Sequence, residues 1–136
     1  MTPRIATAAL ALIAAPLSAA APVTGQWIPA EKDSIVEIAP CGGSICGRVI
    51  RFTAPTPEGP PVDRFNPNPA LRKRPILGLA FLSGFTDGGA NWKGSIYNPR
   101  DGKTYKSFLQ LQKDGRLKVQ GCVGPFCKSM YWTRAR

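Results

Sequence analysis

Hydrophobic and polar residues alternate along most of the chain with a period of two, which is typical of strands buried on one face. In residues 34–39, for example, Val36 and Ile38 fall on the face opposite Glu37. The predicted strands are residues 25–28, 34–39, 45–52, 77–85, 91–97, 103–112, 116–123 and 129–134. In the fourth of these, the same period places four large apolar side chains on one face: Leu77, Leu79, Phe81 and Phe85.

The connections between most of these strands are short and rich in turn residues. Asp-Gly pairs occur in residues 98–103 and 113–116, and Asp-Gly-Gly occurs in 86–91. These residues tolerate the positive φ of tight hairpins, so neighbouring strands should pair antiparallel. A meander of about eight strands usually closes into a barrel, which removes its edges. The sequence therefore predicts an all-β fold, a small antiparallel up-and-down barrel.

One connection, between residues 52 and 77, is far longer than a hairpin requires and contains seven prolines. Asn68 suits the N-cap of a helix, Pro69 suits its first position, and Pro75 ends it. The pattern predicts one short helix of about one and a half turns in this loop, between the third and fourth strands. A long loop in a compact barrel usually acts as a lid or a binding element.

The N-terminal segment has the pattern of a secretory signal peptide. Arg4 precedes an apolar run, and small residues follow it, with Ser18 and Ala20 at −3 and −1 of a cleavage site. The run is shorter than the roughly 20 apolar residues of a membrane span, and no other segment could span a membrane. We therefore predict a signal peptide at 1–20, a single domain at 21–136, and a periplasmic or secreted protein.

The four cysteines form two pairs with the same spacing, Cys41 with Cys46 and Cys122 with Cys127. Each pair flanks a glycine-containing segment that a hairpin end could hold, and exported proteins keep disulfides. We predict the disulfides Cys41–Cys46 and Cys122–Cys127. A zinc site of four cysteines is the alternative, but its ligands usually lie closer together in sequence.

The residue types present exclude much catalytic chemistry. The chain has no histidine, which rules out Ser-His-Asp and Cys-His arrangements and histidine-based metal sites. The only carboxylate set considered for acid–base work is Asp63 with Glu37 or Glu58. We predict no catalytic residue, no metal and no cofactor, and an enzyme is the less favoured interpretation. The net charge of +10 is spread along the chain, and export removes access to nucleic acid, so no nucleic-acid partner is predicted.

Several motifs together resemble the DUF2147 family of exported bacterial proteins, which lacks an assigned activity. They are "GQW" at 25–27, "VEIAPCGGSICGRV" at 36–49, "NPNPALRKRPILGL" at 66–79, "WKGSIYNPRDGKTY" at 92–105 and "YWTR" at 131–134. The resemblance covers almost the whole chain after the leader and implies a lipocalin-like barrel of the calycin type. Many family members lack a counterpart of the Cys122 and Cys127 pair.

The lipocalin analogy also implies how one end of the barrel closes. Lipocalins carry Gly-x-Trp on the first strand, and an Arg near the last strand packs on that Trp. Gly25, Trp27 and Arg134 match this pattern. Such a cation–π contact is worth about 0.5–2 kcal/mol, so Trp27 and Arg134 are expected to be structural.

From these features we predict a non-enzymatic protein that binds a small, partly apolar ligand, and the ligand could carry an anionic group. The candidate ligand contacts are Arg72, Arg74, Trp92, Tyr97 and Tyr105. In the alternative interpretation the barrel is filled by side chains, and the basic surface contacts anionic polymers or lipids of the cell envelope. The stretch 65–75 would then be a structural cover, with Leu71 and Ile76 docked on the barrel. An Arg of this stretch could also pair with Asp63. An apolar cavity under the long loop would favour ligand binding.

Overall fold

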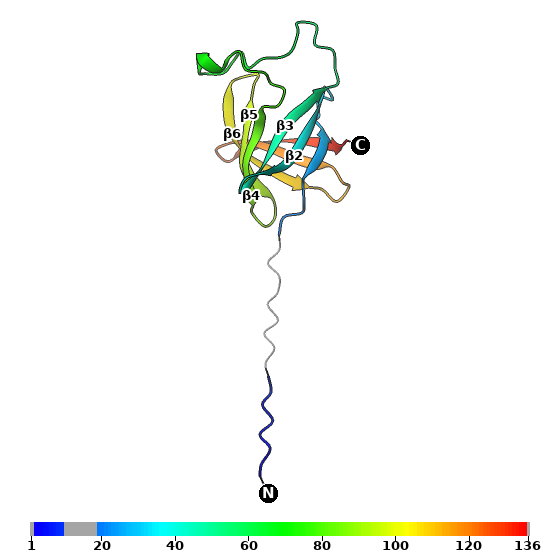
Figure 1. The fold of residues 1–136 in the computed structure, drawn as a ribbon, viewed down its shortest axis with the longest axis vertical. Helices are drawn as coiled ribbons and strands as arrows, with labels where there is room; N and C mark the ends of the chain where they lie inside the picture. The colour runs from blue at the N-terminus through cyan, green and yellow to red at the C-terminus, as the bar shows by residue number, and fades with distance from the viewer. Residues whose placement is uncertain (1, 10–18, 136) are drawn as a thin grey trace.

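The computed structural model describes residues 2–9 and 19–135, and the strands form one closed antiparallel barrel (Figure 1). The strands are β1 (Gly25–Ile28), β2 (Ser34–Cys41), β3 (Ser44–Phe52), β4 (Ala80–Asp87), β5 (Trp92–Asn98), β6 (Lys103–Leu111), β7 (Leu117–Val123) and β8 (Phe126–Arg134). Each strand pairs with its neighbours in sequence, and β1 also pairs with β8, with Trp27 opposite Arg134. The predicted eight-stranded up-and-down barrel is confirmed.

The strand connections lie at two opposite ends of the barrel, because successive connections of a meander alternate between its ends. The open end carries the connections β1–β2, β3–β4, β5–β6 and β7–β8. The closed end carries the other three connections and the entry of the chain into β1, below the strands in Figure 1. The disulfide Cys41–Cys46 links β2 to β3 at the closed end, and Cys122–Cys127 links β7 to β8 at the open end.

The hydrophobic core fills the barrel towards the closed end. Its largest fully buried side chains are Trp27, Ile38, Leu82, Phe85, Leu109 and Leu117. They come from five different strands, so their packing fixes the register of the barrel as a whole. Fully burying one side chain of this size contributes about 1.5–3 kcal/mol.

One strand differs from the expected alternation. In β4 the fully buried residues are Leu82 and Phe85, three positions apart, whereas Leu77 precedes the strand and is exposed. Pairing with β5 shifts register between Ser83 and Thr86, and Gly84 there has φ of 67°. A bulge at this glycine inserts one residue and returns Phe85 to the inner face. The expectation that Leu77, Leu79, Phe81 and Phe85 share one face was therefore wrong.

The predicted helix of one and a half turns is also wrong, because the loop contains only a 3₁₀ turn, Pro69–Leu71. Its start is as expected, since Asn68 Oδ1 accepts a hydrogen bond from the Ala70 amide at 3.0 Å. The chain then turns back, and the Arg74 carbonyl accepts from the Asp63 amide at 3.0 Å. This return pairing, next to a bridge between Val62 and Pro75, leaves no room for a second helical turn.

The segment that precedes β1 covers the closed end. The Ala20 amide donates to both Asp87 carboxylate oxygens at 3.0 and 3.1 Å. The Trp92 indole donates to the Ala21 carbonyl, and the Trp27 indole donates to the Val23 carbonyl, both at 2.9 Å. The predicted cleavage after Ala20 would fall within this contact. Most of the predicted apolar run, residues 10–18, lies outside the described residues, so the leader stays a prediction.

Arg134 completes the closure. Its guanidinium carbon lies 4.0 Å from the Trp27 ring centroid, and its Nη1 donates to the Thr24 carbonyl at 2.9 Å. Gly25, with φ of 126°, passes so close that a Cβ there would lie 2.5 Å from Arg134 Nη1. Glycine suits this position because its positive φ disfavours other residues, and because a Cβ would displace the Arg134 guanidinium from its place over Trp27.

Candidate functional site

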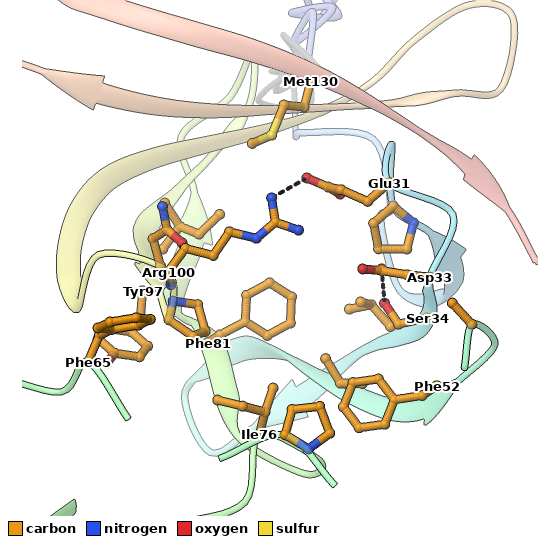
Figure 2. Close-up of a pocket in the computed structure, with 18 of the residues that line it drawn as sticks. Glu31, Asp33, Ser34, Phe52, Phe65, Ile76, Phe81, Tyr97, Arg100 and Met130 are labelled. Atoms are coloured by element: carbon orange, nitrogen blue, oxygen red, sulfur yellow. Dashed lines mark hydrogen bonds and ion pairs between the residues drawn. The ribbon is translucent and has the colours of Figure 1, made fainter. Parts of the chain in front are cut away.

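The open half of the barrel contains a cavity of about 1240 Å³ beneath the long loop. Figure 2 shows side chains from several strands and from the loop converging on it. Its apolar lining includes Val36, Val49, Phe52, Ile76, Phe81, Ile96, Met130 and Trp132. The barrel is therefore not filled by side chains at this end.

One contribution to the cavity comes from the inner face of β7, which lacks a side chain at Gly121. Along that face Leu117 and Val119 are fully buried in the core, and the next inward position is Gly121. A Cβ placed on Gly121 would meet only one neighbouring atom, Ile96 Cγ2, at 3.7 Å. A larger side chain would fit at this position, so the glycine at 121 leaves the space next to Val119 open.

Charged residues of opposite sign face each other at the cavity mouth. Glu31 and Asp33 come from the β1–β2 connection, and Arg100 comes from the β5–β6 turn. Arg100 Nη1 lies 4.0 Å from Glu31 Oε1, and the contact spans the mouth in Figure 2. Both side chains are exposed, so this pair contributes little stability, about 0–1 kcal/mol. It can open without a large cost.

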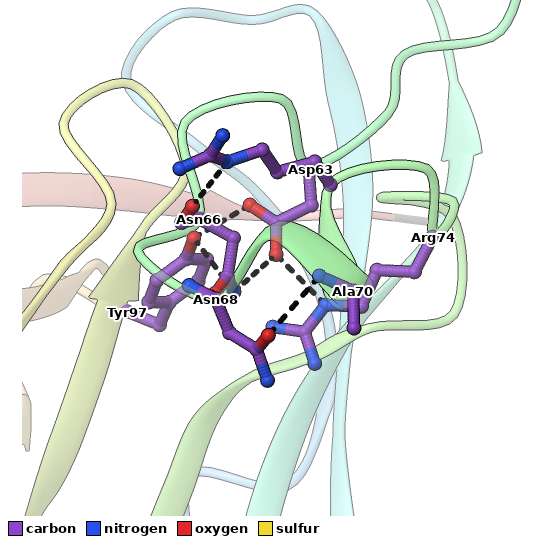
Figure 3. A network of polar contacts seen from close by, with 7 residues as sticks. Asp63, Asn66, Asn68, Ala70, Arg74 and Tyr97 are labelled. Atoms are coloured by element: carbon purple, nitrogen blue, oxygen red, sulfur yellow. Dashed lines mark hydrogen bonds and ion pairs between the residues drawn. The ribbon is translucent and has the colours of Figure 1, made fainter.

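A polar cluster anchors the long loop beside the cavity, and we name it the Asp63 cluster: Asp63, Asn66, Arg74 and Tyr97 (Figure 3). The Asp63 carboxylate is fully buried and has three donors. Tyr97 Oη donates to Oδ1 at 2.5 Å, and Oδ2 accepts from Asn66 Nδ2 at 2.8 Å and from Arg74 Nε at 2.7 Å. The cluster therefore ties both arms of the loop to strand β5.

The protonation states of the cluster follow from these contacts. Burial alone would raise the pKa of Asp63, but hydrogen bonds from Tyr97, Asn66 and Arg74 and the Arg74 charge outweigh it. The pKa of Asp63 is therefore below its usual value. Burial and the hydrogen bond to Asp63 raise the pKa of Tyr97. At neutral pH the cluster is an ionised carboxylate held by a neutral phenol and a guanidinium.

The structure brings two of the five candidate ligand contacts to the cavity. Tyr97 and Tyr105 line it, and the Tyr105 hydroxyl donates to Asp101. Arg72 and Arg74 are not among the lining residues, and Trp92 lies at the closed end against Ala21.

Both arginines that were candidate ligand contacts, Arg72 and Arg74, have partners within the protein. Arg74 forms an ion pair with Asp63, and its guanidinium carbon lies 5.7 Å from the Tyr97 ring centroid. Arg72 Nε donates to the Asn66 carbonyl at 2.8 Å. Within the same loop Leu71 is exposed, whereas Ile76 packs against the core. Arg72 and Arg74 thus position the loop, and Ile76 docks it.

The carboxylates considered for acid–base work do not form a pair. Glu37 is exposed on β2, and Glu58 lies on the exposed part of the loop at the mouth. Asp63 is saturated by its three donors. Among residues 2–9 and 19–135, no three His, Cys, Asp or Glu side chains gather as metal ligands.

Several lining residues were missed from the sequence, including Glu31, Arg100, Phe52, Met130 and Trp132. Gly121 carried a usable signal, because it interrupts the inward series of Leu117 and Val119. Trp132 adds a polar feature to the wall, since its buried Nε1 has no hydrogen-bond partner among the described residues. Buried indole N–H groups usually have one.

A closed antiparallel barrel with an apolar cavity at one end and a Gly-x-Trp seal at the other defines a lipocalin-like protein. The chain belongs to the DUF2147 family, described as uncharacterized proteins conserved in bacteria, whose family model matches residues 25–134. Among solved structures it is similar to protein HP1028 from the human pathogen Helicobacter pylori, which is described as belonging to the lipocalin family. That similarity has a TM-score of 0.75 and 28% sequence identity, and it covers 85% of this chain and 84% of that chain. A search of curated proteins finds no match. No helix in the described part of the chain is long and apolar enough to cross a membrane.

Proposed function

We propose that this protein binds one small, largely apolar molecule inside the barrel. The observation that carries the proposal is the cavity of about 1240 Å³ with its apolar wall. Ligand pockets usually measure about 300–1,000 Å³, so this cavity has room for an elongated amphiphile. The similarity to a protein described as a lipocalin supports the same class of function.

The charged residues of the mouth suggest how such a ligand would be oriented. Its apolar part would lie against Phe81, Ile96 and Met130, and its polar group would remain at the mouth near Arg100 and Glu31. An anionic group would displace Glu31 from Arg100, which costs little because that pair is exposed. Arg72 and Arg74 would support binding only indirectly, through the loop.

The test uses a substitution that fills the cavity. Gly121→Leu places an apolar side chain where a Cβ has free space, so the fold should tolerate it. Gly43→Leu is the matched control, because Gly43 lies at the closed end with no atom within 4 Å of a built Cβ. We expect the unaltered protein to bind about one equivalent of a fluorescent fatty acid. Gly121→Leu should weaken binding at least about tenfold, and Gly43→Leu should not.

Native mass spectrometry of the protein purified after export would identify a retained ligand. If the unaltered protein retains nothing and binds neither fatty acids nor neutral amphiphiles, the binding proposal fails. If Gly121→Leu and Gly43→Leu bind alike while both keep the melting temperature of the unaltered protein, the ligand does not occupy this cavity.

A further inference from the structure

Four apolar side chains at the cavity mouth are exposed to solvent. Phe126 is 80% exposed, Val123 66%, Phe65 50% and Val62 42%. They belong to two segments far apart in sequence, the β7–β8 hairpin and the long loop, and all four border the cavity. Isolated exposed apolar residues are ordinary, but a group around a cavity mouth marks an interaction surface.

Both segments hold these side chains on rigid supports. The disulfide Cys122–Cys127 closes the hairpin directly behind Val123 and Phe126. Val62 and Phe65 flank Asp63, whose carboxylate is fixed by the Asp63 cluster. Apolar tips that are ordered before contact lose little entropy when they are buried in a partner.

Basic residues accompany the apolar ones. Arg64, Arg100 and Lys128 border the same mouth, and the Arg64 guanidinium carbon lies 4.7 Å from the Phe65 ring centroid. Lys128 follows Phe126 by two residues. The carboxylates of the mouth, Glu31, Asp33 and Glu58, come from the β1–β2 connection and from the outer part of the long loop. The protein as a whole carries a net charge of +10, so long-range attraction favours an anionic partner.

We propose that the open-end rim, defined as Val62, Arg64, Phe65, Val123, Phe126 and Lys128, docks the protein on an anionic lipid bilayer. The apolar tips would enter the boundary between headgroups and acyl chains, and the bases would face lipid phosphates. A bilayer fits this chemistry because it offers apolar depth beneath a layer of negative charge. Docked in this way, the cavity mouth faces the membrane, and an amphiphile could pass between them without crossing water. Docking does not require that the cavity be occupied, so this inference goes beyond the proposed function.

The experiment measures co-sedimentation with vesicles of phosphatidylglycerol or of phosphatidylcholine, using the naturally processed protein in every case. We expect binding to phosphatidylglycerol and at least about tenfold weaker binding to phosphatidylcholine, because each base near an anionic surface contributes roughly fivefold in affinity. The double variant V123S/F126S should bind phosphatidylglycerol at least about tenfold more weakly. Ile50→Ser is the matched apolar control, since Ile50 is exposed on the wall of β3, and it should bind unchanged.

A second pair of variants tests the charge. Lys128→Gln should weaken binding several-fold, whereas Lys113→Gln at the closed-end β6–β7 turn should not. Equal binding of V123S/F126S and the unaltered protein would overturn the proposal, as would equal effects of the two lysine variants. A third result would also overturn the proposal. If the unaltered protein is a dimer that does not bind vesicles, and V123S/F126S is a monomer, the rim is the interface with a second copy of the chain. Fatty-acid binding by V123S/F126S in solution, measured separately, shows whether the cavity still works when docking is lost.

Discussion

The two ends of this barrel differ in how far they admit solvent. At the closed end, the fully buried Trp27 donates to a backbone carbonyl and lies under Arg134, and the segment before β1 covers what remains. At the open end, a long loop is held by a buried carboxylate, and it leaves a cavity beneath it and apolar side chains in solvent. One end is built to exclude water, and the other keeps accessible space.

The difference has an energetic consequence. The side chains of the closed end pack on strands from the whole sheet. Removing one of them therefore changes the free energy of unfolding of the barrel as a unit. The loop of the open end can detach locally while the barrel persists, because stability is not uniform across a structure. Changes at the closed end should therefore alter the free energy of global unfolding, and changes at the open end should mainly alter local opening and binding.

The largest expected effect is that of removing the closed-end tryptophan. Trp27→Ala should lower the free energy of unfolding by about 3–5 kcal/mol, the range for truncating a large buried aromatic residue. Phe126→Ala at the open end is the matched aromatic truncation, and it should change this free energy by less than about 0.5 kcal/mol because Phe126 is exposed. Urea unfolding followed by circular dichroism measures both. Equal losses in the two variants would refute the contrast between the ends.

The closed end was predictable through the resemblance to lipocalins, whose short Gly-x-Trp pattern can be recognised directly in the sequence. Gly25 and Trp27 are two residues apart, and the pattern that they form with Arg134 requires only that the first and last strands meet. Strand positions were predictable in the same way, because alternation over a few residues reports which face is buried. Register shifts were not predictable in this way, either at the bulge in β4 near Gly84 or between Ile35 and Val36 in β2, since a single inserted residue reverses the faces of the strand residues that follow it.

The open end was less predictable because its site is assembled from four separate connections. Sequence reasoning named Asp63 as one possible partner of a loop arginine, but it could not choose among acceptors without the return pairing of Arg74 on Asp63. Arg100 and Glu31 lie 69 residues apart and meet only when the barrel closes. Tyr97 was predicted as a candidate ligand contact, but its hydrogen bond to the buried Asp63 carboxylate was not predicted.

The two disulfides allow the same kind of change at each end. Each closes a loop with a sequence separation of 5, so the chain-entropy model gives about 2 kcal/mol or less for either. Replacing both cysteines of one pair by alanine should therefore give similar shifts in the urea midpoint. Vesicle binding should fall only without Cys122–Cys127, since that pair supports Phe126. Loss of vesicle binding in the Cys41–Cys46 variant at unchanged fold would contradict this assignment.

Removing the loop anchor should have a smaller effect on global stability and a larger one on the loop. Asp63→Ala leaves Arg74 without its partner, and losing such charged hydrogen bonds costs about 1–3 kcal/mol. Because the loop can open locally while the barrel stays folded, only part of this cost lowers the free energy of global unfolding. Limited trypsin digestion should show faster cleavage at Arg72 and Lys73, whereas Asp114→Ala, in the exposed β6–β7 turn, should leave that rate unchanged. An unchanged rate in Asp63→Ala would show that the cluster does not hold the loop.

The smallest effect, and the most specific, is the pH dependence of the anchor. The pKa of Asp63 is lowered in the folded protein. Its contribution to the stability of the loop is therefore fully present above pH 3.8, the ordinary pKa, and is lost as pH falls through the lower pKa of the folded state. The pKa of Tyr97 is raised above 10.0, so its contribution to the stability of the loop persists below pH 10.0 and is lost as pH rises through the pKa of the folded state.

Hydrogen exchange of the Asp63 amide, which donates to the Arg74 carbonyl, measures this pH dependence. Its protection factor should be constant from about pH 5 to 9 and fall at more acidic pH. The Ala135 amide, which donates to Gln26 at the closed end, is the internal control and should stay protected. In Asp63→Asn the acid-induced loss should disappear. If it persists there, another carboxylate controls the loop, and the open end is not anchored by Asp63.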